Sequence, residues 1–149
     1  MNRLKIPMLL AALLLSGCAR ESAQPQAMAA DALEGSRWQL ASASQGPLAE
    51  LDAARRVTMA FDAAQVSGSD GCNRYVSGYQ LDGSRLTLAA VATTKMFCAG
   101  DGSIVEKAFL DVLAAPMTLS RQNGGLQLEA ADGNMLRFEP EVPPETATQ

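Results

Sequence analysis

Three cysteines, Cys18, Cys72 and Cys98, are the residues of this sequence with the widest chemical repertoire. Cys72 stands in the segment GCNRYVSGY (71–79), where it could be a nucleophile, a metal ligand or half of a disulfide. The chain has no histidine, which removes Cys-His and Ser-His catalysis and most zinc sites. Cys72 and Cys98 also lack the C-x-x-C spacing of thioredoxin-type oxidoreductases. We therefore expect no catalytic residue, no metal site and no cofactor.

The N-terminal residues 1–17 predict an export signal. Two basic residues, Arg3 and Lys5, precede a single apolar run at 6–15, and small residues follow it. The run is too short to remain in a bilayer as a spanning helix. Residues 1–17 are therefore expected to be a signal peptide.

Cys18 closes this signal in a pattern typical of lipid attachment. The run Leu15-Ser16-Gly17-Cys18 resembles the lipobox of bacterial lipoproteins, in which the cysteine is acylated and becomes the first mature residue. Acyl chains on Cys18 would anchor the protein to a membrane without a spanning helix. Ala19 stands where lipoproteins retained in the inner membrane typically carry Asp, so the resemblance favours the outer membrane, with the domain facing the periplasm.

Cys72 and Cys98 remain as a pair in a chain exported to an oxidising compartment. With no histidine to complete a metal or catalytic site, we expect these two cysteines to form a disulfide. Closing a loop of this length stabilises the fold by about 3.5 kcal/mol on the chain-entropy account.

Other site chemistries have weaker support. Two carboxylates could perform acid/base hydrolysis, but structural roles explain most of the available acids: Asp82 precedes a turn glycine and Glu106 follows Ser103 at capping-box spacing. The acids available for such chemistry are Asp62, Asp70, Asp82, Asp101 and Glu106. The sequence has neither a phosphate loop nor the regular acidic spacing of a calcium loop.

Charge and aromatic content narrow the possible partners. The twelve basic residues fall to ten when Arg3 and Lys5 leave with the signal, against sixteen acidic ones, so nucleic acid is not expected as a partner. Arg74 and Lys95 could recognise an anionic group, although exposed basic residues on strands usually serve solvation. Three aromatic residues could line a pocket or pack in the core, and core packing is favoured: Trp38, Tyr75 and Tyr79.

Short segments with period-two alternation predict antiparallel strands through most of the chain. The alternating apolar residues are Trp38 and Leu40; Val57, Met59 and Phe61; Leu86 and Leu88; Met117 and Leu119; Leu126, Leu128 and Ala130; Leu136 and Phe138. Dipeptides that suit tight hairpins separate them: Asp82-Gly83, Asn123-Gly124 and Asp132-Gly133. We expect seven or eight strands in a strongly curved sheet or partly open barrel.

One amphipathic helix interrupts this pattern at 103–115. Its expected apolar stripe runs along one face, Ser103 and Glu106 form a capping box, and Pro116 ends it. The stripe consists of Ile104, Val105, Ala108, Phe109, Val112 and Leu113. Residues 18–32 are expected to be the lipidated cysteine and a flexible tether, 33–139 a single domain, and the proline-rich 140–149 a disordered tail.

The domain resembles the META domain of HslJ-like bacterial lipoproteins, also described as the DUF306 family. The resemblance rests on VSGSDGCNRYVSGYQLDGSRLTL (66–88), TTKMFC (93–98), VEKAFLDVL (105–113) and LQLEAADGNMLRF (126–138). It implies a mainly β fold with one helix packed on a curved antiparallel sheet. It also marks a structural motif, comprising Gly71, Asn73, Tyr75, Gly78, Tyr79, Thr94 and Met96, with the glycines expected at tight turns and Asn73 expected to stabilise its own turn. The family has no agreed active site, so no functional residue is carried over.

These observations together predict a non-catalytic, lipid-anchored envelope protein that is monomeric and binds a protein, a peptide or a lipid. By resemblance, its role lies in envelope stress or drug tolerance. Two alternatives remain open: an inhibitor of a lysozyme-like hydrolase, and a pilot lipoprotein for a secretin that binds acyl chains within its sheet. An exposed loop that fits a cleft would favour the first, and a continuous apolar cavity the second.

Overall fold

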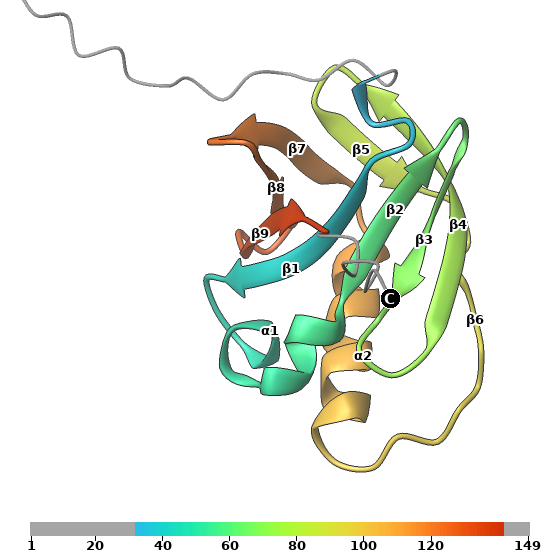
Figure 1. Cartoon of the computed structure of the whole chain (residues 1–149), viewed down its shortest axis with the longest axis vertical. Coiled ribbons are helices and arrows are strands. Elements are labelled where there is room, and N and C mark those ends of the chain that lie inside the picture. The colour runs from blue at the N-terminus through green and yellow to red at the C-terminus, as the bar shows by residue number, and fades with distance from the viewer. Residues whose placement is uncertain (1–31, 142–149) are drawn as a thin grey trace, which may run out of the picture.

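The alternating segments form an antiparallel β-barrel in the computed structural model, which describes residues 32–141 (Figure 1). The signal peptide, Cys18, most of the expected tether and residues 142–149 lie outside the described residues. The elements are β1 (Arg37–Ala43), α1 (Pro47–Glu50), η2 (Asp52–Arg56), β2 (Thr58–Asp62), β3 (Gln65–Ser69), β4 (Arg74–Asp82), β5 (Arg85–Leu88), β6 (Ala92–Thr93), α2 (Asp101–Leu113), β7 (Met117–Gln122), β8 (Gly125–Glu129) and β9 (Met135–Pro140).

The sheet closes on itself, which confirms the predicted fold class. Its strand order is β3-β2-β1-β9-β8-β7-β5-β4-β6, and a further pairing of β3 with β4 joins the two ends into an eight-stranded barrel with β6 as an additional edge strand. All pairings are antiparallel. Closure leaves few unpaired strand edges in the barrel wall.

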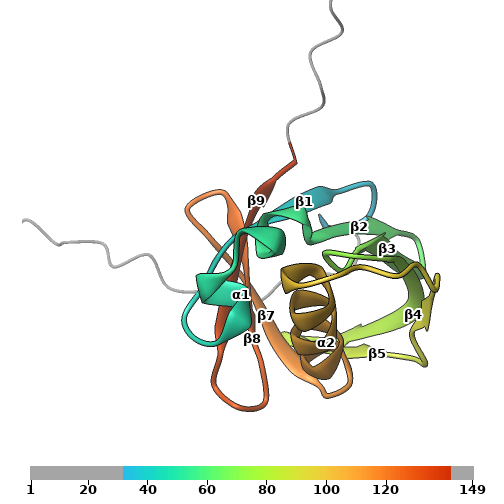
Figure 2. The same cartoon turned by 90° about the horizontal axis from the view of Figure 1, so that it is seen from below.

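The seam between β5 and β7 has the fewest paired residues in the barrel wall. The two strands pair only through Arg85 with Thr118 and Leu86 with Met117. Below this seam the chain leaves β5 for β6, and α2 lies beside the strands at the same end of the molecule (Figure 2). The helix, together with α1 and η2, therefore covers this end of the barrel.

The interior is filled by the side chains that alternation places inward. The fully buried large residues are Leu33, Met59, Phe61, Leu86, Phe109, Leu113, Met117, Leu119, Leu126, Leu128, Leu136 and Phe138. Trp38 and Tyr75 are also buried, as expected for aromatic residues that serve the core, whereas Leu88 is half-buried. A core filled in this way supplies most of the favourable free energy of folding.

Helix α2 begins earlier than its sequence pattern suggested, and the predicted capping box is wrong. Gly100 is the N-cap at φ 64°, a backbone conformation that glycine adopts readily, so the helix can start at Asp101. Ser103 Oγ then donates to Gly100 O (2.9 Å), while Glu106 turns toward the barrel. Pro116 follows the helix end at Leu113, as expected.

The buried face of α2 is narrower than the predicted stripe. Val105, Phe109, Val112 and Leu113 are buried, whereas Ile104 is 49% exposed. Because successive residues on a helix are about 100° apart, Ile104 falls to one side of the line that Val105 and Phe109 define. The helix thus leaves one large apolar residue in solvent in its first turn.

Two boundaries show how local chemistry fixes the barrel. Asn123 and Gly124 both have positive φ (51° and 77°), which suits the tight turn between β7 and β8. At the C-terminal end, Pro140 pairs with Trp38 and belongs to β9, so the prediction that the tail begins at residue 140 is wrong by at least one residue. Pro140 lies beyond the residues of β9 that pair with β8, so its missing N–H removes no hydrogen bond from that ladder.

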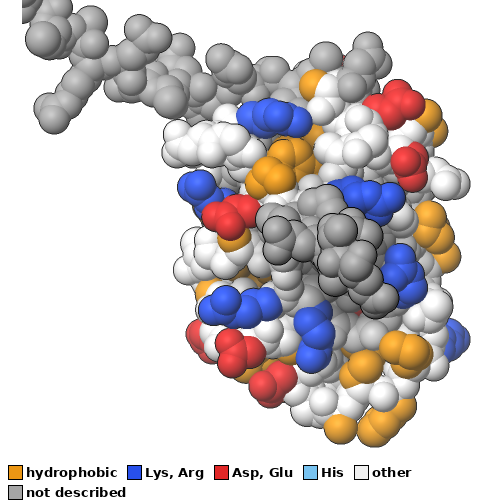
Figure 3. Space-filling view, viewed as in Figure 1, with side chains coloured by type: hydrophobic (Ala, Val, Ile, Leu, Met, Phe, Trp, Pro, Cys, Tyr) orange, Lys and Arg blue, Asp and Glu red, His pale blue; other side chains and the backbone are white. Residues whose placement is uncertain are grey.

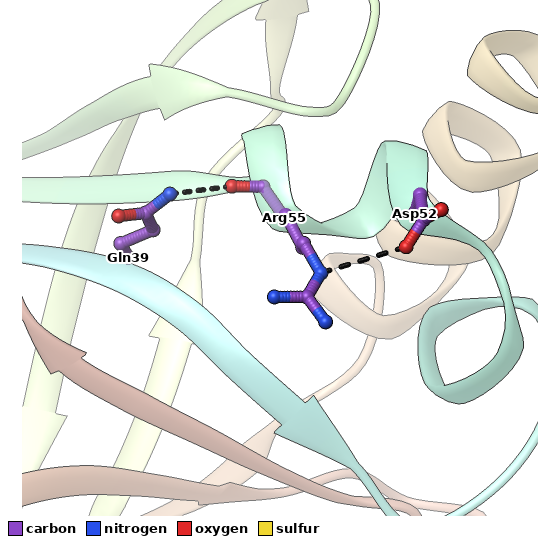
Figure 4. A network of polar contacts seen from close by, with 3 residues as sticks. All are labelled: Gln39, Asp52 and Arg55. Atoms are coloured by element: carbon purple, nitrogen blue, oxygen red, sulfur yellow. Dashed lines mark hydrogen bonds and ion pairs between the residues drawn. The ribbon is translucent and has the colours of Figure 1, made fainter.

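The two short helices between β1 and β2 had no periodic signal in the sequence. η2 is tied to β1 by Gln39, whose Nε2 donates to Arg55 O (2.6 Å), and Arg55 Nε lies 3.5 Å from Asp52 Oδ1 (Figure 4). The ion pair is exposed, so it contributes little to stability. The buried Ala53 and Ala54, together with the hydrogen bond from Gln39, hold η2 beside the strand.

Candidate functional site

The GCNRYVSGY segment begins with a tight turn built around Asp70. This fully buried residue accepts two backbone hydrogen bonds on Oδ1, from the N–H groups of Cys72 (3.0 Å) and Asn73 (2.6 Å). Gly71, which lies between Asp70 and Cys72, has φ 100°, and a Cβ there would lie 2.6 Å from Val105 Cγ1. Both backbone conformation and space therefore require glycine at position 71. The side chain that stabilises this turn is Asp70, so the prediction that Asn73 does so is wrong.

Asn73 instead links three segments that are distant in sequence. Its Nδ2 donates to Glu106 Oε1 on α2 (3.0 Å) and to Cys72 Sγ (3.4 Å). Its Oδ1 accepts from Thr94 Oγ1 (2.8 Å) and from the N–H of Met96 (2.7 Å). Asn73 is 2% exposed, which makes these bonds costly to lose.

The disulfide forms a second link at the same place. Cys72 and Cys98 are bonded, with their Cα atoms 5.9 Å apart, across a sequence separation of 26 residues. Cys98 also packs under the start of α2, since a Cβ on Gly102 would lie 3.1 Å from Cys98 Cβ. The bond therefore fixes both the connection after β6 and the first turn of the helix.

Residues 94–98, which we call the tip, are held from one side while their apolar side chains face solvent. Thr94 N–H donates to Arg74 O (2.9 Å), Met96 N–H is bonded to Asn73, and Cys98 is in the disulfide. Yet Met96 is 61% exposed and Phe97 is 94% exposed. The tip is thus a constrained backbone that presents a thioether and a phenyl ring to water. Exposure of these apolar groups is unfavourable in free energy unless a partner covers them.

Tyr75 serves the core beneath the tip. Its hydroxyl donates to Thr58 O (2.9 Å), and its ring meets Phe109 edge-on at a centroid distance of 5.7 Å. Burial, reinforced by the negative charge of Asp70, raises the pKa of Tyr75 far above its ordinary value. The hydroxyl therefore stays protonated and acts as a structural donor rather than as an acid or base.

The other predicted motif residues lie further along β4. Gly78 sits inside the strand opposite Gln65 with no positive φ, so its assignment to a tight turn is wrong. Tyr79 is half-buried and packs edge-on against Phe61 at 5.3 Å. The predicted motif therefore divides in two: Gly71, Asn73, Thr94 and Met96 gather around the disulfide, whereas Tyr75, Gly78 and Tyr79 lie further along β4.

The carboxylates are distributed in a way that does not form a catalytic pair. Asp62 and Asp82 lie at the ends of β2 and β4, while Asp101 is in the first turn of α2. Asp70 and Glu106 both contact Asn73, but Asp70 is fully buried and its Oδ2 has no hydrogen-bond partner among residues 32–141. Hydrolysis by two acids requires that water and substrate reach both carboxylates, and they cannot reach Asp70.

Open grooves lie on the surface beside α2. One of about 510 Å³ lies between α1 and α2 and includes Gln45, Leu48, Asp111 and Asn134. Another of about 540 Å³ lies between the end of β5 and α2, and the apolar residues Leu88, Val91, Leu110 and Leu113 are among those that line it. The filled core between the described strands leaves no continuous apolar channel of the kind expected for a pilot lipoprotein.

Two features of this site were missed in the sequence. The turn-forming role of Asp70 had a signal, because Asp-Gly dipeptides often form side-chain-stabilised turns. No signal in the sequence indicated that Met96 and Phe97 are exposed, since two apolar residues beside a cysteine suggest a buried position. In the described part of the chain no group of three or more Cys, Asp, Glu or His side chains is placed to hold a metal, and no helix there is long and apolar enough to cross a membrane.

Solved structures share the fold at low sequence identity. An NMR structure of a protein from Burkholderia xenovorans superposes with a TM-score of 0.63 at 22% identity, covering 87% of this chain and all of that one. A second NMR structure gives 0.61 at 21% identity and covers 75% of this chain and 94% of that one. A crystal structure of a DUF4847 family protein from Bacteroides vulgatus gives a TM-score of 0.52 at 12% identity and covers 76% of this chain and 98% of that one. No curated protein matches the chain.

The sequence pattern of the META domain matches residues 31–143, a span that includes all the described strands and helices. The segments that suggested this resemblance, from β3 and β4 through the tip to α2, β8 and β9, are those that build the barrel and hold the tip. The META domain is not a known catalytic family. The chain belongs to the META domain family.

Proposed function

We propose that this chain is a non-catalytic, lipid-anchored protein of the bacterial envelope that acts by binding through its tip. The observation that carries the proposal is the clamped backbone of residues 94–98 with Phe97 94% exposed. A fixed loop loses little conformational entropy on binding, so its apolar side chains contribute more of their burial free energy to affinity. Asp70 and Glu106 are engaged with Asn73, which holds this loop, and the hydroxyl of Tyr75 is engaged with Thr58 O in β2.

Sequence features support the proposed anchor and location. The signal at residues 1–17 and the lipobox-like run ending at Cys18 support lipidation, and Ala19 supports the outer membrane with the domain in the periplasm. The family resemblance supports a role in envelope stress or drug tolerance. The domain acts as a monomer, without nucleic acid or cofactor.

An inhibitor of a lysozyme-like hydrolase is the second candidate, because the same clamped and exposed loop could enter a cleft. The mature chain would then slow purified lysozyme at stoichiometric concentration, and Phe97→Ser would abolish this effect. A rate of cell-wall hydrolysis that the chain does not change removes the candidate.

Two variants test the main proposal in cells that lack the native chain. Cys18→Ser is expected to move the protein out of the membrane fraction and to remove its protection against envelope stress. Phe97→Ser is expected to remain in the membrane and stay folded but to lose that protection, because the binding side chain is gone. Val76→Ser is the matched control, since Val76 is also exposed (40%) but lies on the barrel wall in β4. Protection that survives Phe97→Ser, or Cys18→Ser protein that stays in the membrane, contradicts the proposal.

A further inference from the structure

The tip is the place where large apolar side chains gather in solvent. Among the described residues four large hydrophobic side chains are exposed, and three of them belong to this end of the molecule: Met96, Phe97 and Ile104. Ile104 lies in the first turn of α2, two residues after the Gly102 that packs on Cys98. Figure 3 shows hydrophobic side chains at the lower end of the molecule, where the connection from β6 enters α2 in Figure 1. Single exposed apolar residues are ordinary, but a fixed cluster indicates a contact surface.

The footprint of this cluster is small, which bears on the kind of partner. A stable protein–protein interface covers about 800 Å² and roughly 20 or more residues on each partner. Here the apolar side chains number three, and polar residues such as Thr94 and Asp101 surround them. A lipid bilayer does not require shape complementarity, because a few side chains can enter its interface without a matched surface.

Basic side chains border the tip. Lys95 lies within it, Arg74 is exposed beside Thr94, and Arg56 donates from Nε to Gly71 O (3.1 Å) next to the disulfide. Asp101 is the exposed acid at this end, and Glu106 is half-buried on Asn73. Among the exposed side chains at this end, three basic residues stand against the single acid Asp101, whereas Asp70 is fully buried. Such a border complements anionic lipid headgroups.

The position of the tip relative to the chain start makes a second membrane contact possible. The described chain begins at the opposite end of the long axis from the tip (Figure 1). The fifteen residues from Cys18 to Ala32 can reach about 50 Å when extended, whereas a domain of about 110 residues measures about 35 Å across. The attached domain can therefore turn and bring its tip to the membrane that holds the anchor. Attachment raises the effective concentration of bilayer, so a weak contact suffices.

We propose that the tip inserts Phe97 and Met96 into the interface of an anionic bilayer, which gives the anchored domain a second point of membrane contact. This inference rests on the proposed lipid anchoring. Asn73 and the disulfide hold the backbone so that the phenyl ring and the thioether point outward in advance, and Lys95 and Arg74 lie at headgroup level.

A tryptophan introduced at the tip reports this insertion in the lipidated protein. Phe97→Trp protein purified from membranes is reconstituted in mixed vesicles of phosphatidylcholine and phosphatidylglycerol, with and without bromine on the acyl chains. We expect the emission of the introduced indole to shift to the blue and to be quenched by the brominated lipid. The native Trp38 is 3% exposed, so the unaltered protein supplies the background signal. Lys95→Glu in the same protein should lower the quenched fraction about fivefold or more.

A tryptophan at the other end of the barrel is the matched control. Arg85→Trp places the indole in the β4–β5 hairpin, away from the tip, where it should stay unquenched in the same vesicles. The proposal is overturned if the tip indole of Phe97→Trp emits as in water while the protein still floats with the vesicles, a result that leaves the anchoring intact. Equal quenching in the Arg85→Trp control also overturns it.

Two further outcomes separate the remaining explanations. Emission from Phe97→Trp that shifts without vesicles, in a concentration-dependent way, indicates burial of the tip in a second copy and overturns the membrane contact. Protein that does not float with the vesicles at all contradicts the anchor itself and therefore the proposed function.

Discussion

Phe109→Asp is expected to unfold the domain. Phe109 is fully buried on α2, in edge contact with Tyr75. Removing the phenyl ring costs about 3 to 5 kcal/mol, and burying an unpaired carboxylate among apolar side chains adds several more. The total free energy of unfolding of a domain of this size is about 5 to 15 kcal/mol. Circular dichroism should therefore show no cooperative thermal transition and little β signal.

Ile104→Asp on the same helix is the matched control for this change. Ile104 is 49% exposed, so its carboxylate remains in water and the melting temperature should change little. A Phe109→Asp protein that melts at the temperature of the unaltered chain would contradict the packing of α2 over the barrel end.

Removal of the disulfide has the second-largest expected effect. The double variant Cys72→Ala with Cys98→Ala should lose about 3.5 kcal/mol of unfolding free energy, because the unfolded chain regains the freedom of a loop that the bond had closed. Replacing both cysteines avoids leaving one reactive thiol. Urea denaturation of the double variant and of the unaltered chain measures the difference in unfolding free energy directly.

Thiol counting provides the matching chemical measurement. The unreduced, lipidated chain should contain no reactive thiol, since Cys72 and Cys98 are bonded and Cys18 is acylated in the proposed mature form. Two reactive thiols, or a double variant as stable as the unaltered chain, would show that the bond does not form in the native protein.

The barrel was largely predictable because its signals are local. Alternation at Val57, Met59 and Phe61 places all three side chains in the core, and the same holds for Leu126 with Leu128. The turn at Asn123-Gly124 has the positive φ angles that its sequence indicates. In each case the side-chain period or the turn chemistry acts within a few residues, so the sequence alone contains the information.

The tip was not predictable because its contacts are long-range. Asn73 reaches Met96 and Glu106 across separations of 23 and 33 residues, and no local pattern indicates which partners it selects. The sequence instead suggested two local arrangements: Asn73 bonded in its own turn, and Glu106 in a capping box. In the structure Asp70 takes the first role, and Gly100 begins the helix without a side-chain cap. Exposure of Phe97 follows from these anchors rather than from its own residue type.

Amide hydrogen exchange at Met96 measures whether the tip is held rigid while its side chains face water. The N–H of Met96 donates to Asn73 Oδ1 (2.7 Å), so it should exchange at least about 100-fold more slowly than in an unstructured peptide. Asn73→Ala should remove that protection, while the amide of Ala130, bonded to Asn134 O away from the tip, stays protected in both proteins. A Met96 amide that exchanges in the unaltered chain as fast as in a free peptide would contradict the account.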